Sequence, residues 1–215
     1  MSSTVGLLHS VTMAASPDPD AALMLRVKRG DLTAFEELVE KYKQPVMSLV
    51  YRTLPDPTEA EDLAQAVFVQ VFKSADRYQP SARFTTWLFT IARNLCLNEI
   101  RRRSRHPAES IEAGWTGEEG EPARELGDDR APGPVELLLR GELEAKVDAA
   151  VRALPENQRT ALTLCQREEM SYEEIAAVLG CSLSATKSLI HRARETLKVR
   201  LKAYLRTGEW DENGG

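Results

Sequence analysis

A single stretch without apolar periodicity divides this 215-residue chain into two parts. Residues 107–135 contain the run GWTGEEGEPARELGDDRAPGP, in which glycine, proline and acidic residues replace the regular apolar pattern found on both sides. A segment of this composition cannot bury enough apolar surface to offset the entropy of ordering it. It predicts a flexible acidic linker between two units, at residues 21–106 and 136–206.

The two ends of the chain lack the pattern of either unit. Residues 1–20 finish in the breaker run Ser-Pro-Asp-Pro-Asp, which predicts a disordered N-terminal extension. Residues 207–215 form a tail that is too short to fold alone.

Within the two units apolar residues recur at helical spacing and strand-like runs are almost absent, so the fold class is all-α. Pro45 should kink or split the helix that contains it. The chain is thus expected to form two small helical domains, a helical bundle followed by a helix-turn-helix domain. The predicted helices span about 31–53, 58–75, 84–103, 136–153, 156–168, 172–179 and 184–205.

Several classes of protein are excluded by composition. No run approaches the ~18 apolar residues of a membrane span, and no basic residue precedes the weakly apolar N-terminus, as a secretion signal requires. The cysteines Cys96, Cys165 and Cys181 are widely spaced without metal-ligand companions. We therefore expect a cytoplasmic protein without membrane insertion, metal, cofactor or disulfide.

The net charge of −5 conceals an uneven distribution. Residues 109–148 hold twelve acidic and four basic residues, a net charge of −8, which leaves about +3 for the rest of the chain. Local clusters of basic residues govern phosphate binding more than the total charge does. These clusters are Arg101, Arg102, Arg103 and Arg105, and Lys187, Arg192, Arg194, Lys198, Arg200, Lys202 and Arg206.

The segment SYEEIAAVLGCSLSATKSLIHRARETLKVRL has the helix-turn-helix pattern. A capping box of Ser171 and Glu174 begins a short helix, Gly180 permits the sharp turn, and Ser182 or Ser184 caps the next helix. That second helix has an apolar back and a polar, basic front suited to the major groove.

The front of this helix supplies the candidate contacts to duplex DNA. The early positions Lys187, Ser188, His191 and Arg192 are expected at base edges. Arg194 and Lys198 are expected at phosphates, where they add affinity without sequence information.

Two motifs in the first unit narrow the prediction. Asp62, Gln65 and Phe68 form a DLxQxxF motif, and Phe84–Asn94 form an FxxWLxxIARN motif followed by arginines. Together with the helix-turn-helix, over residues 22–105 and 136–206, the chain resembles the extracytoplasmic-function (ECF) sigma factors of bacterial RNA polymerase.

The resemblance implies a non-enzymatic subunit for promoter-specific transcription initiation. It assigns Asp62, Gln65 and Phe68 to core polymerase binding, on the coiled coil of the largest subunit, with a second contact at the flap region. It assigns the front of the helix-turn-helix to the −35 element as duplex. Reading of the −10 element as melted non-template strand falls to Tyr78, Arg83, Arg93, Asn94, Arg101 and Arg102. Trp87 is expected to pack in the core.

The sequence departs from the family pattern at several positions. Ala66 replaces a frequent acidic residue, which removes one rim contact with the polymerase. Ala185 and Thr186 replace a frequent Thr-Val pair, and Thr186 should bond back to the helix backbone. Leu189 replaces a frequent arginine. The resemblance also implies an anti-sigma factor as a partner and an acidic linker near the RNA channel of the polymerase.

Two other functions are compatible with a helix-turn-helix. An autonomous regulator would dimerise, sense a ligand through its first unit and bind an operator without polymerase. An enzyme acting on nucleic acid would need a carboxylate cluster for metal ions, and the sequence suggests none.

Overall fold

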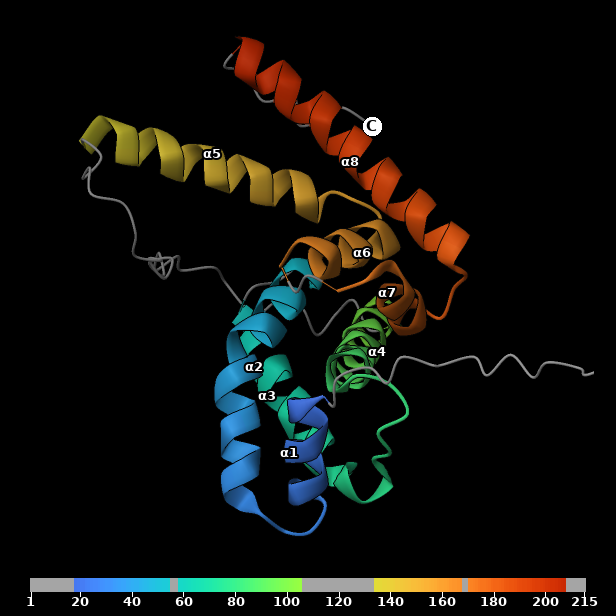
Figure 1. Ribbon diagram of the computed structural model, residues 1–215. Helices are drawn as coiled ribbons and strands as arrows, with labels where there is room; N and C mark the ends of the chain where they lie inside the picture. Colours follow the sequence, from blue (N-terminus) through green and yellow to red (C-terminus); the bar gives the residue numbers. More distant parts are fainter. Residues whose placement is uncertain (1–17, 55–57, 106–133, 168–169, 208–215) are drawn as a thin grey trace, which may run out of the picture.

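The computed structural model describes residues 18–54, 58–105, 134–167 and 170–207, and within these ranges every regular element is a helix (Figure 1). The all-α fold class is confirmed. No helix in this part of the chain is long and apolar enough to cross a membrane. Predictions for the residues before 18, for 106–133 and for those after 207 lie outside the described residues.

The first helix, α1 (Pro19–Val27), corrects the expected extent of the N-terminal extension. Asp18 is its N-cap and Pro19 occupies the start of its first turn. Proline suits this position because its missing N–H needs no partner there. Asp18 and Pro19, which belong to the run read as a helix breaker, therefore start a helix, and Ala21, Met24 and Val27 are buried.

Three further helices complete the first unit, close to their predicted positions. These are α2 (Leu32–Thr53), α3 (Thr58–Lys73) and α4 (Phe84–Arg105), with a 3₁₀ turn at Ala75–Arg77. Pro45 does not split α2. Tyr42, Val46 and Leu49, on either side of it, are buried, so packing keeps the helix continuous where proline removes one backbone hydrogen bond.

The second unit contains α5 (Pro134–Arg152), α6 (Glu156–Arg167), α7 (Tyr172–Leu179) and α8 (Leu183–Thr207). The capping box of Ser171 and Glu174 is present, and Gly180 ends α7 in the left-handed region with φ 64°. Ser182 accepts a hydrogen bond from the N–H of Ala185 at 3.2 Å, so it is the cap of α8. Helices α7 and α8 thus form the predicted helix-turn-helix.

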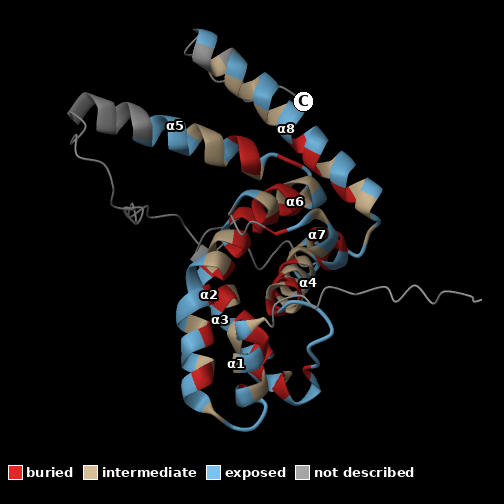
Figure 2. Ribbon diagram, in the orientation of Figure 1, coloured by how far each residue is buried: buried red, intermediate tan, exposed pale blue. Residues whose placement is uncertain are grey.

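The sequence predicts two small domains joined by a flexible linker, and in this structure the two units are packed together. Helix α6 lies against α2, and α7 lies against α4 (Figures 1 and 2). Ile175 and Ile190 belong to the same buried cluster as the core of the first unit. Arg52 on α2 forms an ion pair with Asp148 on α5 at 2.7 Å. No periodic pattern in a sequence records such a contact between distant segments.

Candidate nucleic-acid and partner interfaces

An apolar groove runs along the surface between α2 and α3. It is lined by Phe35, Val39, Gln65, Phe68, Val69, Phe72 and Lys73. Val69 and Phe72 are 51% and 45% exposed, and the rings of Phe35 and Phe72 lie 5.1 Å apart. Neighbouring exposed apolar side chains of this kind mark protein interaction sites.

Two of the three predicted polymerase-binding residues line this groove. Gln65 and Phe68 do so, while Asp62 is exposed on the same helix outside the lining. Sequence reasoning missed Phe35, Val39, Val69 and Phe72. Their signal was that α2 and α3 carry more apolar residues than one buried stripe needs.

The loop between the 3₁₀ turn and α4 has buried ends and an exposed middle. Tyr78 is 1% exposed, and the hydroxyl of this residue has no hydrogen-bond partner. Burial raises the pKa of Tyr78 to about 12, so the hydroxyl stays neutral. Its ring packs on Trp87 at 4.9 Å between centroids. We predicted a nucleic-acid contact for Tyr78, but the structure places this side chain in the core. Trp87 packs against the core as expected.

The other residues predicted to contact the −10 strand differ in whether they contact the second unit. Asn94 is exposed. Arg83 is exposed but lies 3.4 Å from Glu174 of α7. Arg93 donates to the side-chain oxygen of Asn157 at 2.9 Å, and its Nε lies 3.5 Å from Glu156. Two arginines predicted to contact DNA therefore face the second unit in this structure.

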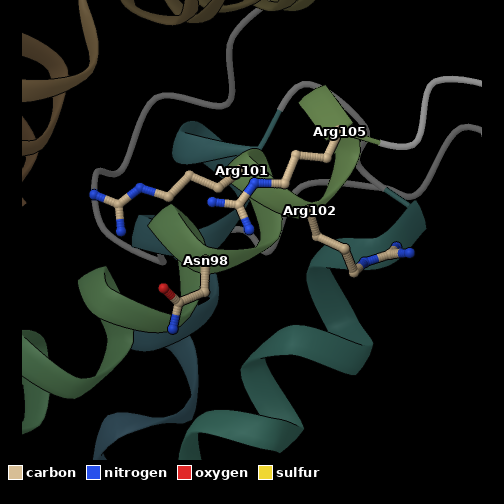
Figure 3. A pocket seen from close by; sticks show the side chains of 4 residues that line it. All are labelled: Asn98, Arg101, Arg102 and Arg105. Carbon is tan, nitrogen blue, oxygen red and sulfur yellow. The ribbon is translucent and has the colours of Figure 1, made fainter.

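The C-terminal end of α4 carries a basic groove lined by Asn98, Arg101, Arg102 and Arg105 (Figure 3). Arg101 and Arg102 point to opposite sides in this view, and Arg102 lies 2.8 Å from Glu99. Sequence reasoning missed Asn98, although its spacing from Arg101 and Arg105 is that of one helix face. Basic side chains in the last turn also interact favourably with the helix dipole.

The predicted front of the recognition helix is exposed along α8. All six residues proposed for duplex contact are exposed: Lys187, Ser188, His191, Arg192, Arg194 and Lys198. On the back, Thr186, Ile190 and Ala193 are buried. The Thr186 hydroxyl donates to the Ser182 carbonyl at 3.2 Å, as predicted. The helix thus presents one polar, basic face away from its own core.

The second unit also explains what Arg194 and Ser188 do within the fold. Arg194 Nη2 lies 3.7 Å from Cys165 Sγ on α6, and the Ser188 hydroxyl donates to the Ser184 carbonyl at 3.0 Å.

Within the described residues, no three histidine, cysteine, aspartate or glutamate side chains are grouped to hold a metal ion.

Two protein families match this chain in the order of its two units. Sigma-70 region 2 matches residues 38–106, and Sigma-70, region 4 matches residues 144–197. The chain is 38% identical over 189 residues to the RNA polymerase sigma-H factor of Pseudomonas aeruginosa, covering 88% of this chain and 97% of that protein. It is 35% identical over 191 residues to the ECF RNA polymerase sigma-E factor of Escherichia coli K12, covering 87% and 96%.

Solved structures agree with these matches. CnrH, solved in complex with the cytosolic domain of CnrY, is 28% identical with a TM-score of 0.60, over 86% of this chain and 99% of that one. The sigma factor RpoE of Bartonella quintana, solved with the anti-sigma factor NepR, shares the fold at 24% identity and a TM-score of 0.61, over 78% and 96%. This chain therefore belongs to the extracytoplasmic-function sigma factors, the sigma-70-type subunits that act with RNA polymerase in transcription initiation.

Proposed function

We propose that this sigma factor reads the −35 element as duplex DNA through α8 and the −10 element as melted non-template strand through α4 and the preceding loop. The observation that carries the proposal is the pair of exposed basic faces on one chain, one on each unit. A single DNA-binding face would suit an operator, whereas two faces suit a promoter with two separated elements.

The α8 face fits duplex recognition by its geometry and charge. A helix enters the major groove of B-DNA, where base edges present distinct donors and acceptors. Lys187, Ser188, His191 and Arg192 are exposed on the first half of α8 and are the residues we assign to base edges. Arg194 and Lys198 follow on the same helix and are assigned to phosphates.

The α4 face fits a single strand. Melting a promoter costs base-stacking energy, and capture of an extruded base together with neutralised phosphates can offset that cost. Asn94 carries both a donor and an acceptor for a base edge. Arg83, Arg93, Arg101 and Arg102 are assigned to the strand around it. We no longer assign a direct contact to Tyr78, because it is buried.

The groove between α2 and α3 is the proposed docking site for the coiled coil of the largest polymerase subunit. Its lining is mostly apolar with two polar residues, Gln65 and Lys73, a composition that suits a helix-on-helix interface with an apolar core and polar rim. An anti-sigma factor that covered this groove and the α8 face would block both the binding of core polymerase and the recognition of the −35 element. We also infer that the protein acts in the cytoplasm and has no catalytic reaction of its own.

The decisive experiment is run-off transcription with purified core polymerase on a genomic promoter library. We expect RNA from discrete start sites, reactive unpaired thymines at the −10 position, and loss of RNA when either promoter element is substituted. Tight operator binding by a dimer without polymerase, with no RNA from any promoter, would instead support an autonomous regulator.

A pair of variants tests the docking site within the same assay. Val69→Asp places a charge in the groove and should abolish binding to core polymerase. Leu32→Asp changes a residue that is somewhat more exposed, at 59% against 51% for Val69, but lies outside the groove lining. It should bind core polymerase like the unaltered protein. Equal binding by both variants would remove the groove from the interface.

A further inference from the structure

Helix α1 holds both ends of the loop that precedes α4. The Asp18 carboxylate accepts a hydrogen bond from the N–H of Phe84 at 2.7 Å, at the start of α4. The Lys28 ammonium donates to the carbonyl of Tyr78 at 3.0 Å, at the other end of the loop. Helix α1 also contacts α4 and the 3₁₀ turn directly (Figure 1).

Helix α1 is itself firmly attached to α2. The Asp20 carboxylate is buried and accepts hydrogen bonds from Lys41 at 2.6 Å and from the Tyr42 hydroxyl at 2.6 Å. Burial and the hydrogen bond to Asp20 raise the pKa of Tyr42, so its hydroxyl remains a donor. Met24, a residue of α1, is fully buried. The groups that hold the loop therefore sit on a fixed support.

One carboxylate serves the starts of two helices. Asp18 Oδ1 accepts from the N–H of Asp20 at 3.0 Å in α1, while Oδ2 accepts from Phe84 in α4. Phe84 is only 1% exposed, so its N–H has little access to water if Asp18 is removed. A buried donor left without a partner is costly, and a negative charge at a helix N-terminus is stabilising.

The loop between these two attachments is open to solvent. Gln79, Pro80, Ser81, Ala82 and Arg83 are all exposed. A loop with fixed ends and an exposed middle can present its backbone and Arg83 in one arrangement before any ligand arrives. Preorganisation of this kind removes an ordering cost from binding.

We propose that Asp18 and Lys28 are positioning residues for −10 recognition, holding the ends of the 79–83 loop in its strand-reading conformation. This inference rests on the proposed −10 function. Both residues lie outside the part of the chain that matches the sigma-70 region 2 family, residues 38–106. Neither residue touches DNA in this role.

Asp18→Ala should weaken discrimination between promoters more than it weakens transcription in general. With the loop end released, the complex with the correct −10 sequence must order the loop, whereas a complex with a wrong sequence can leave it loose. The ratio of initiation on the intact promoter to that on a −10-substituted promoter should fall about five-fold, a factor typical of losing a helix cap. Lys28→Met should lower the ratio less.

The measurement is initiation by reconstituted holoenzyme on the most active promoter from the run-off library, in intact, −10-substituted and −35-substituted forms. A ratio between templates is independent of the fraction of folded protein, so a mere folding defect leaves it unchanged. The −35 ratio should stay constant in every variant. Asp18→Asn keeps an acceptor oxygen and should restore most of the −10 ratio.

Asp31→Ala is the matched control, because Asp31 caps α2 through the N–H of Ala34 at 3.2 Å and its hydrogen-bond partners, Arg26, Thr33 and Ala34, all lie outside the loop. It should leave both ratios unchanged. If Asp18→Ala and Lys28→Met keep the −10 ratio of the unaltered protein, the positioning role is wrong. If the unaltered holoenzyme itself shows no −10 discrimination, the proposed function fails first.

Discussion

The arginines at the end of α4 look equivalent in the sequence and are not equivalent in the structure. Arg103 forms ion pairs with Glu99 in its own helix, α4, and with Glu59 of α3. Its side chain is 16% exposed. Arg101 is exposed and lines the basic groove with Asn98. A cluster of four basic residues therefore combines a structural arginine, Arg103, with arginines that we propose to face DNA.

Substituting these arginines singly should separate the two roles. Arg101→Ala should lower the magnitude of the slope of log promoter affinity against log salt by about 0.7–0.9, because one phosphate contact is lost. Arg103→Ala should leave that slope unchanged and lower the thermal midpoint of the protein, since Glu59 and Glu99 lose a common partner. Filter binding by holoenzyme across a salt series measures the first effect and calorimetry the second. Identical slopes in both variants would contradict this division.

Asp31 gives a pH dependence whose sign follows from its pKa. Hydrogen bonds from the Thr33 hydroxyl, the Ala34 N–H and Arg26 lower its pKa from 3.8 to about 2. A carboxylate whose pKa is lower when folded stabilises the protein above about pH 4, and this contribution is lost as the pH falls toward 2. Asp31→Asn should therefore flatten the fall in unfolding free energy between pH 4 and pH 2, measured by urea titration. An unchanged slope would show that Asp31 is not responsible.

At the scale of single elements, the turn between α7 and α8 depends on one backbone conformation. Gly180 has φ 64°, and an added Cβ would meet no atom within 4 Å. Any cost of Gly180→Ala thus comes from the left-handed backbone itself, about 1 kcal/mol. Gly180→Asn should cost less, because asparagine tolerates this region. Denaturant unfolding of both variants tests the order; equal stability of Gly180→Ala and the unaltered protein would refute it.

Elements with strong local signals could be predicted from the sequence, and the rest could not. The two ends of α7 and the start of α8 follow from Ser171, Glu174, Gly180 and Ser182, which act within their own turns. Helix α1 was missed because Asp18-Pro19 is equally a helix start and a breaker signal, and only packing of Met24 decides between them. The groove residues were missed because helical periodicity identifies the apolar face of a helix. It does not show which residues of that face remain exposed after the neighbouring helices have packed.

At the scale of the whole molecule, the packing of the two units affects which DNA contacts are available. Arg93 is engaged by Glu156 and Asn157, and Arg83 lies beside Glu174, all from the second unit. Neither arginine can keep these partners and bind a DNA strand through the same atoms. The −10 role that we propose for Arg83 and Arg93 therefore requires these contacts to be exchanged for DNA contacts.

The Arg52–Asp148 ion pair should help to hold the units in this arrangement, because the Arg52 side chain is only 11% exposed. Asp148 is 42% exposed, and its removal takes away the ion-pair partner that the mostly buried Arg52 has on α5, which should cost more than the loss of a fully exposed pair. Asp148→Ala should therefore shift the molecule toward an extended form, seen as a larger radius of gyration in small-angle X-ray scattering. Glu195→Ala removes the exposed partner of Lys198 within α8, at 3.4 Å, and should leave the radius unchanged. If both variants scatter like the unaltered protein, Arg52 and Asp148 do not hold the units together, and contact between α4 and α7 or between α2 and α6 is sufficient without them.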